Sequence, residues 1–309
     1  PVLLTENLVP AVKIPFPFSV KGKFNSLSHA LAVELFLPQM FYNGITTDTL
    51  NLTVNSDIEK LNYSVELSAI SNNMLMLRNV LLNGALQNNN LNFSLTAAKD
   101  KNIKILEIEG RLKMENQNFE LKFNPKVNLN TTEWSVDTAN LIRFGKDGFI
   151  AHQLIISNNT QFISIHSHEK SKNAPFEIKL ANFDLATISK IVEKRDGLVK
   201  GDLNGYLIVK NQNSIPGITS EIELSNFFFN KVELGSIFLH ADNNEKPDKY
   251  NVALNIFGNG NNVGINGYYI TAPAINKLDF IVDFKNINIT SVEPYTFGKV
   301  TDMTGVASG

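Results

Sequence analysis

Apolar residues alternate with polar ones along most of this 309-residue chain, and this period of two constrains the fold more than any other feature. Successive side chains of a β-strand point to opposite faces of the sheet, so the pattern predicts strands with one buried and one solvated face. Antiparallel sheets have this character, whereas strands of parallel sheets are apolar on both faces. The clearest segments carry Leu91, Phe93, Leu95 and Ala97; Phe119, Leu121 and Phe123; Ile163 and Ile165; Phe176, Ile178 and Leu180; Ile222 and Leu224; Val252, Leu254 and Ile256; Phe280, Val282 and Phe284; and Ile287 and Ile289.

Asparagine and glycine separate these segments. The chain holds 41 Asn residues, and Asn and Gly favour turns, so we predict turns at 88–90, 116–118, 158–159, 243–244 and 259–260. One short helix is predicted in DLATISKIVEK, where Asp184 would be the N-cap and Leu185, Ile188 and Ile191 would lie on one side. The segment SLSHALAVELF fits a helix or a strand. The chain is therefore predicted to be all-β, a repetitive antiparallel sheet with one or two short helices.

Two repeats are visible. A short one places a glycine between apolar residues at Gly84, Gly110, Gly205 and Gly267. A longer one relates residues 176–205 to 280–309 at a constant offset of 104, and each copy predicts a strand, a short helical turn and a G-x-x-x-G entry into the next strand. We expect residues 1–309 to form one continuous repetitive β body. Because the chain begins at Pro1 and the second copy stops at its last glycine, we also expect it to be part of a longer polypeptide.

Composition excludes several classes of function. A net charge of −2 gives no basic footprint for nucleic acid or anionic lipid headgroups, and the lack of cysteine excludes disulfides and thiolate metal sites. No run approaches the roughly 20 apolar residues of a membrane-spanning helix. Six N-x-[ST] triplets occur, and a chain this rich in Asn, Ser and Thr produces them by chance. They are located at Asn51, Asn62, Asn92, Asn130, Asn158 and Asn288.

The candidates for chemistry are weak. In IFGNGNNVGINGYYI the third glycine is one residue late for a dinucleotide-binding loop, and a strand rather than a helix is predicted after it, so we predict a hairpin. His166 and His168 share one strand face but lack further zinc ligands nearby. Trp134 fits a ligand platform or, preferably, a strand core anchor, and Phe227–Phe229 fit an edge of the apolar interior. We predict no catalytic residue, no metal, no cofactor and no enzyme activity.

Several segments carry a family resemblance. They are SVDTANLIRFGKDGFIAHQLIISNNTQFISIHS, FEIKLANFDLATISKIVEKRDGLVKGDLNGYLIV, IELSNFFFNKVELGSIFLHA, GINGYY and VEPYTFGKV. In order and spacing they resemble the C-terminal part of TamB-like proteins of the AsmA-like group, with the closest likeness to Bacteroidetes members. The likeness is best from about Trp134 onward.

The resemblance implies a fold and a role. Such proteins are long, are anchored in the inner membrane by an N-terminal helix that is absent from this sequence, and cross the periplasm. Their sheet curls into a U-shaped, taco-like groove with an apolar interior. They take part in phospholipid transport to the outer membrane and in outer-membrane biogenesis, together with an Omp85-type barrel partner. The triplets DTL at 48–50 and DTA at 137–139 also resemble a short O-glycosylation signal, which would place a glycan on Thr49 or Thr138.

The physics of the alternation agrees with a groove. A sheet with one apolar face and no long helix must close as a sandwich or barrel, or curl into a groove that a lipid completes. Two alternatives stay open: a chaperone-like scaffold for outer-membrane proteins that acts through exposed strand edges, and an adhesin or carbohydrate-binding β-sandwich. We expect the groove to be lined by Leu91, Phe93, Leu95, Ile163, Ile165, Phe176, Ile178, Leu180, Ile222, Leu224, Val252, Leu254, Ile256, Phe280, Val282 and Phe284.

Overall fold

The computed structural model describes residues 12–73, 75–100, 103–192, 198–210, 215–271, 276–296 and 299–309. The fold is all-β: 72% is strand, two helices are short, and the strands form one large antiparallel sheet that is not closed. The predicted strand content and antiparallel pairing are thereby confirmed. Residue contacts group into two compact units, unit 1 (Pro1–Thr138 with Lys190–Lys194) and unit 2 (Ala139–Ser189 with Arg195–Gly309).

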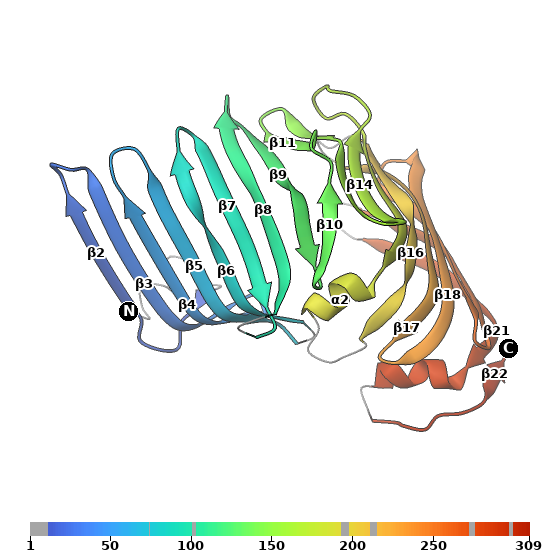
Figure 1. The fold of residues 1–309 in the computed structure, drawn as a ribbon. Coiled ribbons are helices and arrows are strands. Elements are labelled where there is room, and N and C mark those ends of the chain that lie inside the picture. Colours follow the sequence, from blue (N-terminus) through green and yellow to red (C-terminus); the bar gives the residue numbers. More distant parts are fainter. Residues whose placement is uncertain are drawn as a thin grey trace. The chain divides into compact units, whose positions relative to one another are not determined.

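Unit 1 is a meander in which each strand from β3 to β9 pairs with the next, and β10 returns along β9 (Figure 1). β1 and β2 pair with opposite ends of β3. In the segment SLSHALAVELF the first four residues form a turn, and the rest is the start of β3, so the segment is not a helix. The strands of unit 1 are β1 (Val12–Lys13), β2 (Ser19–Asn25), β3 (Ala30–Tyr42), β4 (Ile45–Ser56), β5 (Leu61–Ser71), β6 (Met76–Gln87), β7 (Asn90–Ala98), β8 (Lys104–Glu115), β9 (Asn118–Leu129) and β10 (Thr132–Val136).

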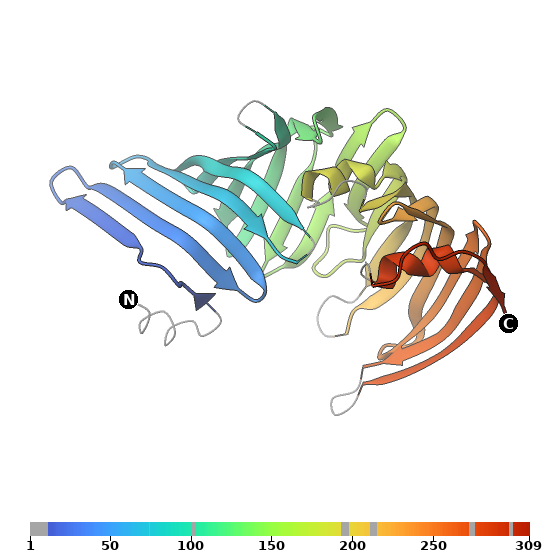
Figure 2. The same ribbon diagram turned by 90° about the horizontal axis from the view of Figure 1, so that it is seen from below.

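Unit 2 contains a β11–β12 hairpin and a longer meander from β13 to β22. The helix α2 connects β15 to β16, and the 3₁₀ helix η1 connects β21 to β22 and packs against β18 and β21 (Figures 1 and 2). The elements of unit 2 are β11 (Leu141–Gly145), β12 (Gly148–His152), β13 (Leu154–Asn158), β14 (Gln161–Ser167), β15 (Phe176–Asp184), the first part of α2 (Ala186–Val192, whose last three residues belong to unit 1), β16 (Val199–Lys210), β17 (Gly217–Phe229), β18 (Val232–Lys246), β19 (Lys249–Gly258), β20 (Asn261–Ile270), β21 (Lys277–Asn288), η1 (Ile289–Thr296) and β22 (Val306–Ser308).

Asparagine is abundant because two-residue hairpin turns need positive φ. At Asn88-Asn89 the φ angles are 49° and 60°, and at Asn259-Gly260 they are 48° and 78°. Both central residues of a type I′ turn have positive φ, and Asn tolerates this region better than other non-glycine residues. Asn116 and Asn159 also have positive φ at predicted turns. At these turns Asn supplies the positive φ angle, and its low strand propensity carries no penalty because the turn residues lie between the strands.

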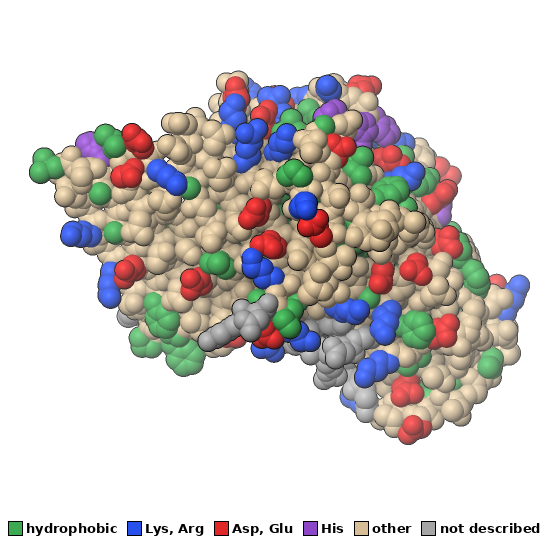
Figure 3. Space-filling model, in the orientation of Figure 1, with side chains coloured by type: hydrophobic (Ala, Val, Ile, Leu, Met, Phe, Trp, Pro, Cys, Tyr) green, Lys and Arg blue, Asp and Glu red, His purple; other side chains and the backbone are tan. Residues whose placement is uncertain are grey.

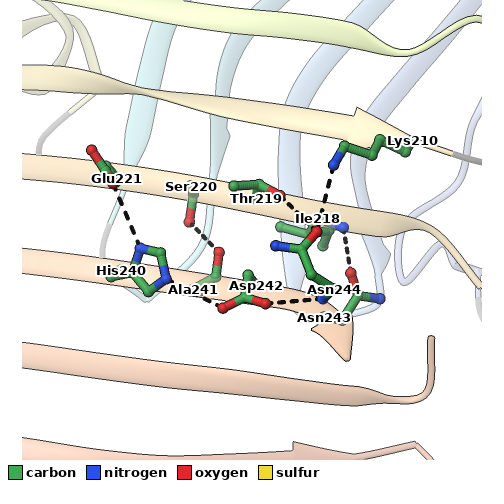
Figure 4. Close-up of polar contacts among 10 residues, drawn as sticks. All are labelled: Lys210, Ile218, Thr219, Ser220, Glu221, His240, Ala241, Asp242, Asn243 and Asn244. Atoms are coloured by element: carbon green, nitrogen blue, oxygen red, sulfur yellow. Dashed lines mark hydrogen bonds and ion pairs between the residues drawn. The ribbon is translucent and has the colours of Figure 1, made fainter. Parts of the chain in front are cut away.

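The turn predicted at 243–244 is wrong. Both residues lie inside β18, where the pairing with β19 is irregular, and the chain reverses only at 247–248. Asn243 is buried, and its side chain replaces ladder hydrogen bonds. Its Oδ1 accepts from the Ile218 amide at 2.6 Å (Figure 4), and its Nδ2 donates to the Pro247 carbonyl at 2.7 Å. Because a buried side-chain amide can satisfy the backbone in this way, the Asn-Asn pair marks a bulge.

The predicted helix forms with its predicted cap. The Asp184 carboxylate accepts a hydrogen bond from the Ala186 amide at 2.8 Å, which satisfies one of the free donors of the first turn. Ile191 is buried, whereas Ile188 is exposed, so the apolar side of α2 is only partly covered.

Fully buried apolar residues are few and are concentrated in the middle of the chain. In unit 1 they include Ile105, Val127 and Leu129 on β8 and β9, and Trp134, which is 1% exposed. In unit 2 they include Leu154 on β13 and Phe183 on β15. Trp134 therefore serves as a strand core anchor, as preferred from the sequence, and most other apolar strand residues keep part of their surface accessible.

Candidate functional site

Directly paired residues of antiparallel strands lie on the same face, so the pairing register shows which side chains form a continuous surface. In unit 1 the register joins apolar residues of nine strands into one row. The row consists of Val20, Leu35, Leu52, Val65, Leu82, Leu95, Ile108, Val127 and Trp134. The alternation seen in single strands is thus kept in register across the sheet.

Unit 2 repeats this arrangement. One row crosses nine strands through Ile156, Ile163, Leu180, Gly205, Ile222, Leu239, Leu254, Ile265 and Val282. A neighbouring row runs through Phe183, Leu203, Leu224, Ile237, Ile256, Val263 and Phe284. We call the side of each unit that carries such rows its apolar face.

The side chains of the apolar face are only partly buried. In the first row of unit 2 no member is fully buried, and Val282 is exposed. In unit 1 only Val127 and Trp134 of the row are buried, and Val20 at the edge strand is exposed. A closed sandwich would bury its inner side chains almost completely, because protein cores pack without gaps. The partial exposure therefore leaves each apolar face with surface that a further apolar group can cover.

The short glycine repeat has a packing reason that the sequence alone did not supply. Gly84, Gly110 and Gly267 pair directly with the aromatic residues Tyr63, Phe93 and Phe280, respectively. A Cβ on Gly110 would lie 2.5 Å from the Lys122 carbonyl oxygen and 2.9 Å from Phe93 Cζ, both closer than real Cβ atoms approach. Each aromatic ring therefore lies over the glycine on the next strand, and the apolar face is smoothed by aromatic rings at these positions.

Polar groups within the apolar face are few, and one shows the effect of its surroundings. Burial raises the pKa of the Tyr63 hydroxyl, because the phenolate is disfavoured away from water. Tyr63 Oη donates to the Asn92 carbonyl at 3.3 Å, so its polar end is satisfied at the strand backbone. The ring itself contributes apolar surface beside Val54.

The opposite face is mostly polar and of mixed charge, although it also carries the stacked rings of Phe238 and Phe257. On the side of the molecule seen in Figure 3, acidic and basic side chains are scattered rather than gathered into a patch of one sign. In unit 2 His240 lies 3.9 Å from Glu221 and 3.2 Å from Asp242 (Figure 4), beside a shallow cavity of about 510 Å³ that also has Tyr206 and Phe238 in its wall. These contacts are ion pairs only when the imidazole is protonated, and even then exposed ion pairs contribute little to stability. They keep this face solvated.

All of the predicted lining residues lie on strands that carry the apolar face of their unit. Leu91, Phe93 and Leu95 lie on β7 of unit 1, and the others lie on β14 to β21 of unit 2. Phe280, Val282 and Phe284 are exposed, and the rest are half-buried. The register joins Ile163, Leu180, Ile222, Leu254 and Val282 into one row. Whether these side chains contact a lipid stays a prediction.

Sequence reasoning missed most of the apolar face of unit 1. Leu35, Leu52, Val65 and Leu82 belong to its row but were not among the predicted lining residues. The signal was present in the alternation of LNLTV at 50–54 and of LNYSVEL at 61–67, where Asn, Thr, Ser and Glu occupy the intervening positions. β3 was harder to find, because its segment also fits a helix.

The other residues singled out from the sequence have structural roles. Gly258, Gly260 and Gly264 belong to the β19–β20 hairpin, and β20 follows as a strand. His166 faces His152 on β12, with ring centroids 6.4 Å apart. Among the described residues, no group of three or more His, Asp or Glu is placed to hold a metal. The triple-Phe segment lies at irregular β17–β18 pairing, and Phe229 stacks on Tyr295 of η1 at 5.4 Å.

No family model, no curated protein and no solved structure matches this chain. No helix in the described part of the chain has the length and apolar character needed to span a bilayer.

Proposed function

We propose that the apolar face binds acyl chains and conducts phospholipid along a β groove, as part of a periplasm-spanning, TamB-like protein anchored in the inner membrane. The observation that carries the proposal is the register of the apolar rows: the longest row of each unit crosses nine strands, and most of its members stay partly accessible. The resemblance to TamB-like proteins of the AsmA-like group agrees with it. In this role the protein takes part in outer-membrane biogenesis with an Omp85-type barrel partner and has no catalytic residues.

The dimensions suit a lipid tail. Strands in a sheet lie about 4.8 Å apart, so a row of nine strands extends over about 38 Å. One leaflet contributes about half of the roughly 30 Å hydrocarbon core of a bilayer, so a row is longer than one acyl chain. Each buried CH₂ contributes about 0.8 kcal/mol, and a continuous apolar lining therefore binds lipid without a shaped pocket.

A continuous lining also permits movement. Neighbouring positions along a row are chemically equivalent, since Ile222, Leu239 and Leu254 follow one another on successive strands. A lipid tail that moves by one strand exchanges one set of aliphatic contacts for another of similar free energy. The curled groove places the headgroup in solvent, where the mixed polar surroundings hold it only weakly.

Crosslinking at adjacent residues tests this proposal. A photo-crosslinking amino acid at Leu254, on the apolar face, should capture phospholipid in the periplasm, whereas the same amino acid at Asn255, on the polar face, should not. Mass spectrometry of the crosslinked lipid measures the outcome. Equal labelling at the two positions would contradict the proposal, and so would a chain that purifies free of lipid and is never labelled at Leu254.

A further inference from the structure

The polar face of unit 2 carries a cavity of about 510 Å³ that crosses four strands, from β16 to β19. Its floor is backbone, because Gly205, Ile222 and Leu239 line it although they belong to a row on the apolar face. Six side chains of the polar face surround the backbone of Ile222 at the centre. They are Asn204 and Tyr206 on β16, Glu221 and Glu223 on β17, and Phe238 and His240 on β18.

Two aromatic rings lie at opposite corners of this cavity. Tyr206 on β16 and Phe238 on β18 are separated by two strands and by two residues along the strands. On a sheet this separation is about 12 Å, which leaves space for one six-membered ring between the two side chains. Phe257 stacks on Phe238 with ring centroids 5.1 Å apart, on the side away from Tyr206, so the other ring face of Phe238 is left toward the cavity.

The carboxylates of the cavity are acceptors without a basic partner. Glu221 lies 3.9 Å from His240 (Figure 4), and Glu223 Oε1 accepts from Ser225 Oγ at 3.0 Å. Within the described part of the chain, neither Glu221 nor Glu223 forms an ion pair with Lys or Arg. Both carboxylates therefore retain lone pairs that a ligand can use.

The cavity also offers hydrogen-bond donors. Asn204 Oδ1 accepts from the Asn182 amide at 2.8 Å, so Asn204 Nδ2 remains as a donor. The Tyr206 hydroxyl can donate and accept. Donors and acceptors therefore lie together beside two apolar ring faces.

This combination selects one class of ligand. An anion would be repelled by the two carboxylates, and an apolar ligand would bury them without hydrogen bonds. An organic cation would bind carboxylates and aromatic rings, but it offers only donors, so Asn204 Nδ2 would face it without an acceptor. A neutral sugar satisfies the whole set, because its hydroxyls donate and accept while the C–H faces of its ring are apolar.

We propose that this cavity binds a neutral saccharide, with one pyranose ring over the backbone of Ile222 and between Tyr206 and Phe238. The C–H faces of the sugar contact the two aromatic rings. Its hydroxyls donate to the two carboxylates and accept from Asn204 Nδ2. The site lies on the face opposite to the one proposed for lipid, so the two ligands do not compete.

The cavity is longer than one sugar ring. It continues to Ala253 and Asn255 on β19, and four strands extend over about 14 Å. The small side chain of Ala253 leaves space there, and the exposed amide of Asn255 can bind hydroxyls of a second sugar unit. A disaccharide should therefore bind more tightly than the monosaccharide.

Saturation-transfer NMR with the whole chain tests the site. The probes are cellobiose and chitobiose, their monosaccharides glucose and N-acetylglucosamine, and the ionic compounds putrescine and inorganic phosphate. At least one disaccharide should bind, about fivefold more tightly than its monosaccharide, because the second unit adds hydrogen bonds. The ionic compounds should not displace it. Absence of binding by both disaccharides would overturn the proposal, and displacement by putrescine would assign the cavity to a cation and would also overturn it.

Two pairs of variants locate the sugar. Tyr206→Ala should weaken disaccharide binding about fivefold, whereas Tyr206→Phe, which retains the ring, should keep most of it. Glu223→Gln should weaken binding about tenfold, because it removes charge-assisted hydrogen bonds. Glu233→Gln, at an exposed residue of β18 that does not line the cavity, should have no effect.

Circular dichroism verifies that the four variants fold. Unchanged binding in Tyr206→Ala and Glu223→Gln would place the sugar elsewhere on the chain and would contradict the assignment of this cavity. Lipid crosslinking at Leu254, on the opposite face, is a separate readout, so either proposal can fail without the other.

Discussion

The two copies of the 104-residue repeat show how one local sequence pattern gives the same connections but different burial. In the first copy the Asp184 carboxylate accepts from the Ala186 amide at 2.8 Å, and in the second the Asn288 amide oxygen accepts from the Thr290 amide at 3.1 Å. The strand side chains differ: Ile178 is half-buried between two strands, whereas Val282 at the equivalent position is 57% exposed. Local sequence sets the caps, and the neighbouring strands set the burial.

The helical segments of the two copies differ in type because one of them contains a proline. α2 is an α-helix, whereas η1 is a 3₁₀ helix that contains Pro294 at the position equivalent to Lys190. Proline has no amide hydrogen and clashes with the preceding turn of an α-helix, so the tighter and less regular form is favoured. Tyr295 of η1 then stacks on Phe229 at the end of β17. One residue changes the helix type while the entry and exit hydrogen bonds persist.

The largest expected effect is at a glycine of the first copy. Gly205 has φ of 137°, and a Cβ there would clash with the Glu221 carbonyl and lie 2.8 Å from Ile222 Cα on β17. Gly205→Ala should lower the free energy of unfolding of unit 2 by about 3 kcal/mol or more, measured by chemical denaturation. Gly305→Ala is the matched control: its φ is 117°, but the nearest atom is Ile289 Cδ1 at 3.6 Å, so only the backbone strain of about 1–2 kcal/mol is expected. Equal losses would show that close strand packing is not the cause.

A substitution effect of intermediate size is expected to differ between equivalent positions of β15 and β21. Ile178→Ala removes half-buried contacts between β14 and β16 and should cost about 2 kcal/mol. Val282→Ala, at the equivalent position, should cost about 0.5 kcal/mol or less, because its side chain is mostly solvated. Denaturation of both variants under one set of conditions gives the comparison. A cost at Val282 as large as at Ile178 would mean that the exposure of the side chain does not set the loss of stability.

The smallest expected effect is at the caps. Asp184→Ala and Asn288→Ala should each cost about 1 kcal/mol, the usual loss on removing an N-cap side chain. The Asn288→Ala substitution should lower the stability somewhat more, because Asn288 Nδ2 also donates to the Asn259 carbonyl at 2.9 Å. Thermal denaturation resolves such differences. Unchanged stability in both variants would show that water replaces the cap at little cost.

Much of the fold was predictable because its signals are local. The alternation at Leu91–Leu95 and Val252–Ile256 depends on only one strand at a time, and the turn at Asn259-Gly260 depends on two residues. The prediction of a turn at Asn243-Asn244 was wrong because the same residue type also satisfies a bulge when its amide is buried, and burial depends on Ile218 in another strand. For the same reason the glycine repeat was visible in the sequence, while the rings of Tyr63 and Phe93 over Gly84 and Gly110 were not.

By itself the sequence determined an all-β, antiparallel chain with an apolar and a polar side on each strand, Asn-based turns, one capped helix and a repeat of 104 residues. Each of these follows from side-chain periodicity or from the backbone preferences of a few adjacent residues. Only the tertiary structure decided that the apolar sides align into rows over nine strands and how far each row stays accessible. Register and burial are properties of pairs of strands distant in sequence, and no local preference specifies them.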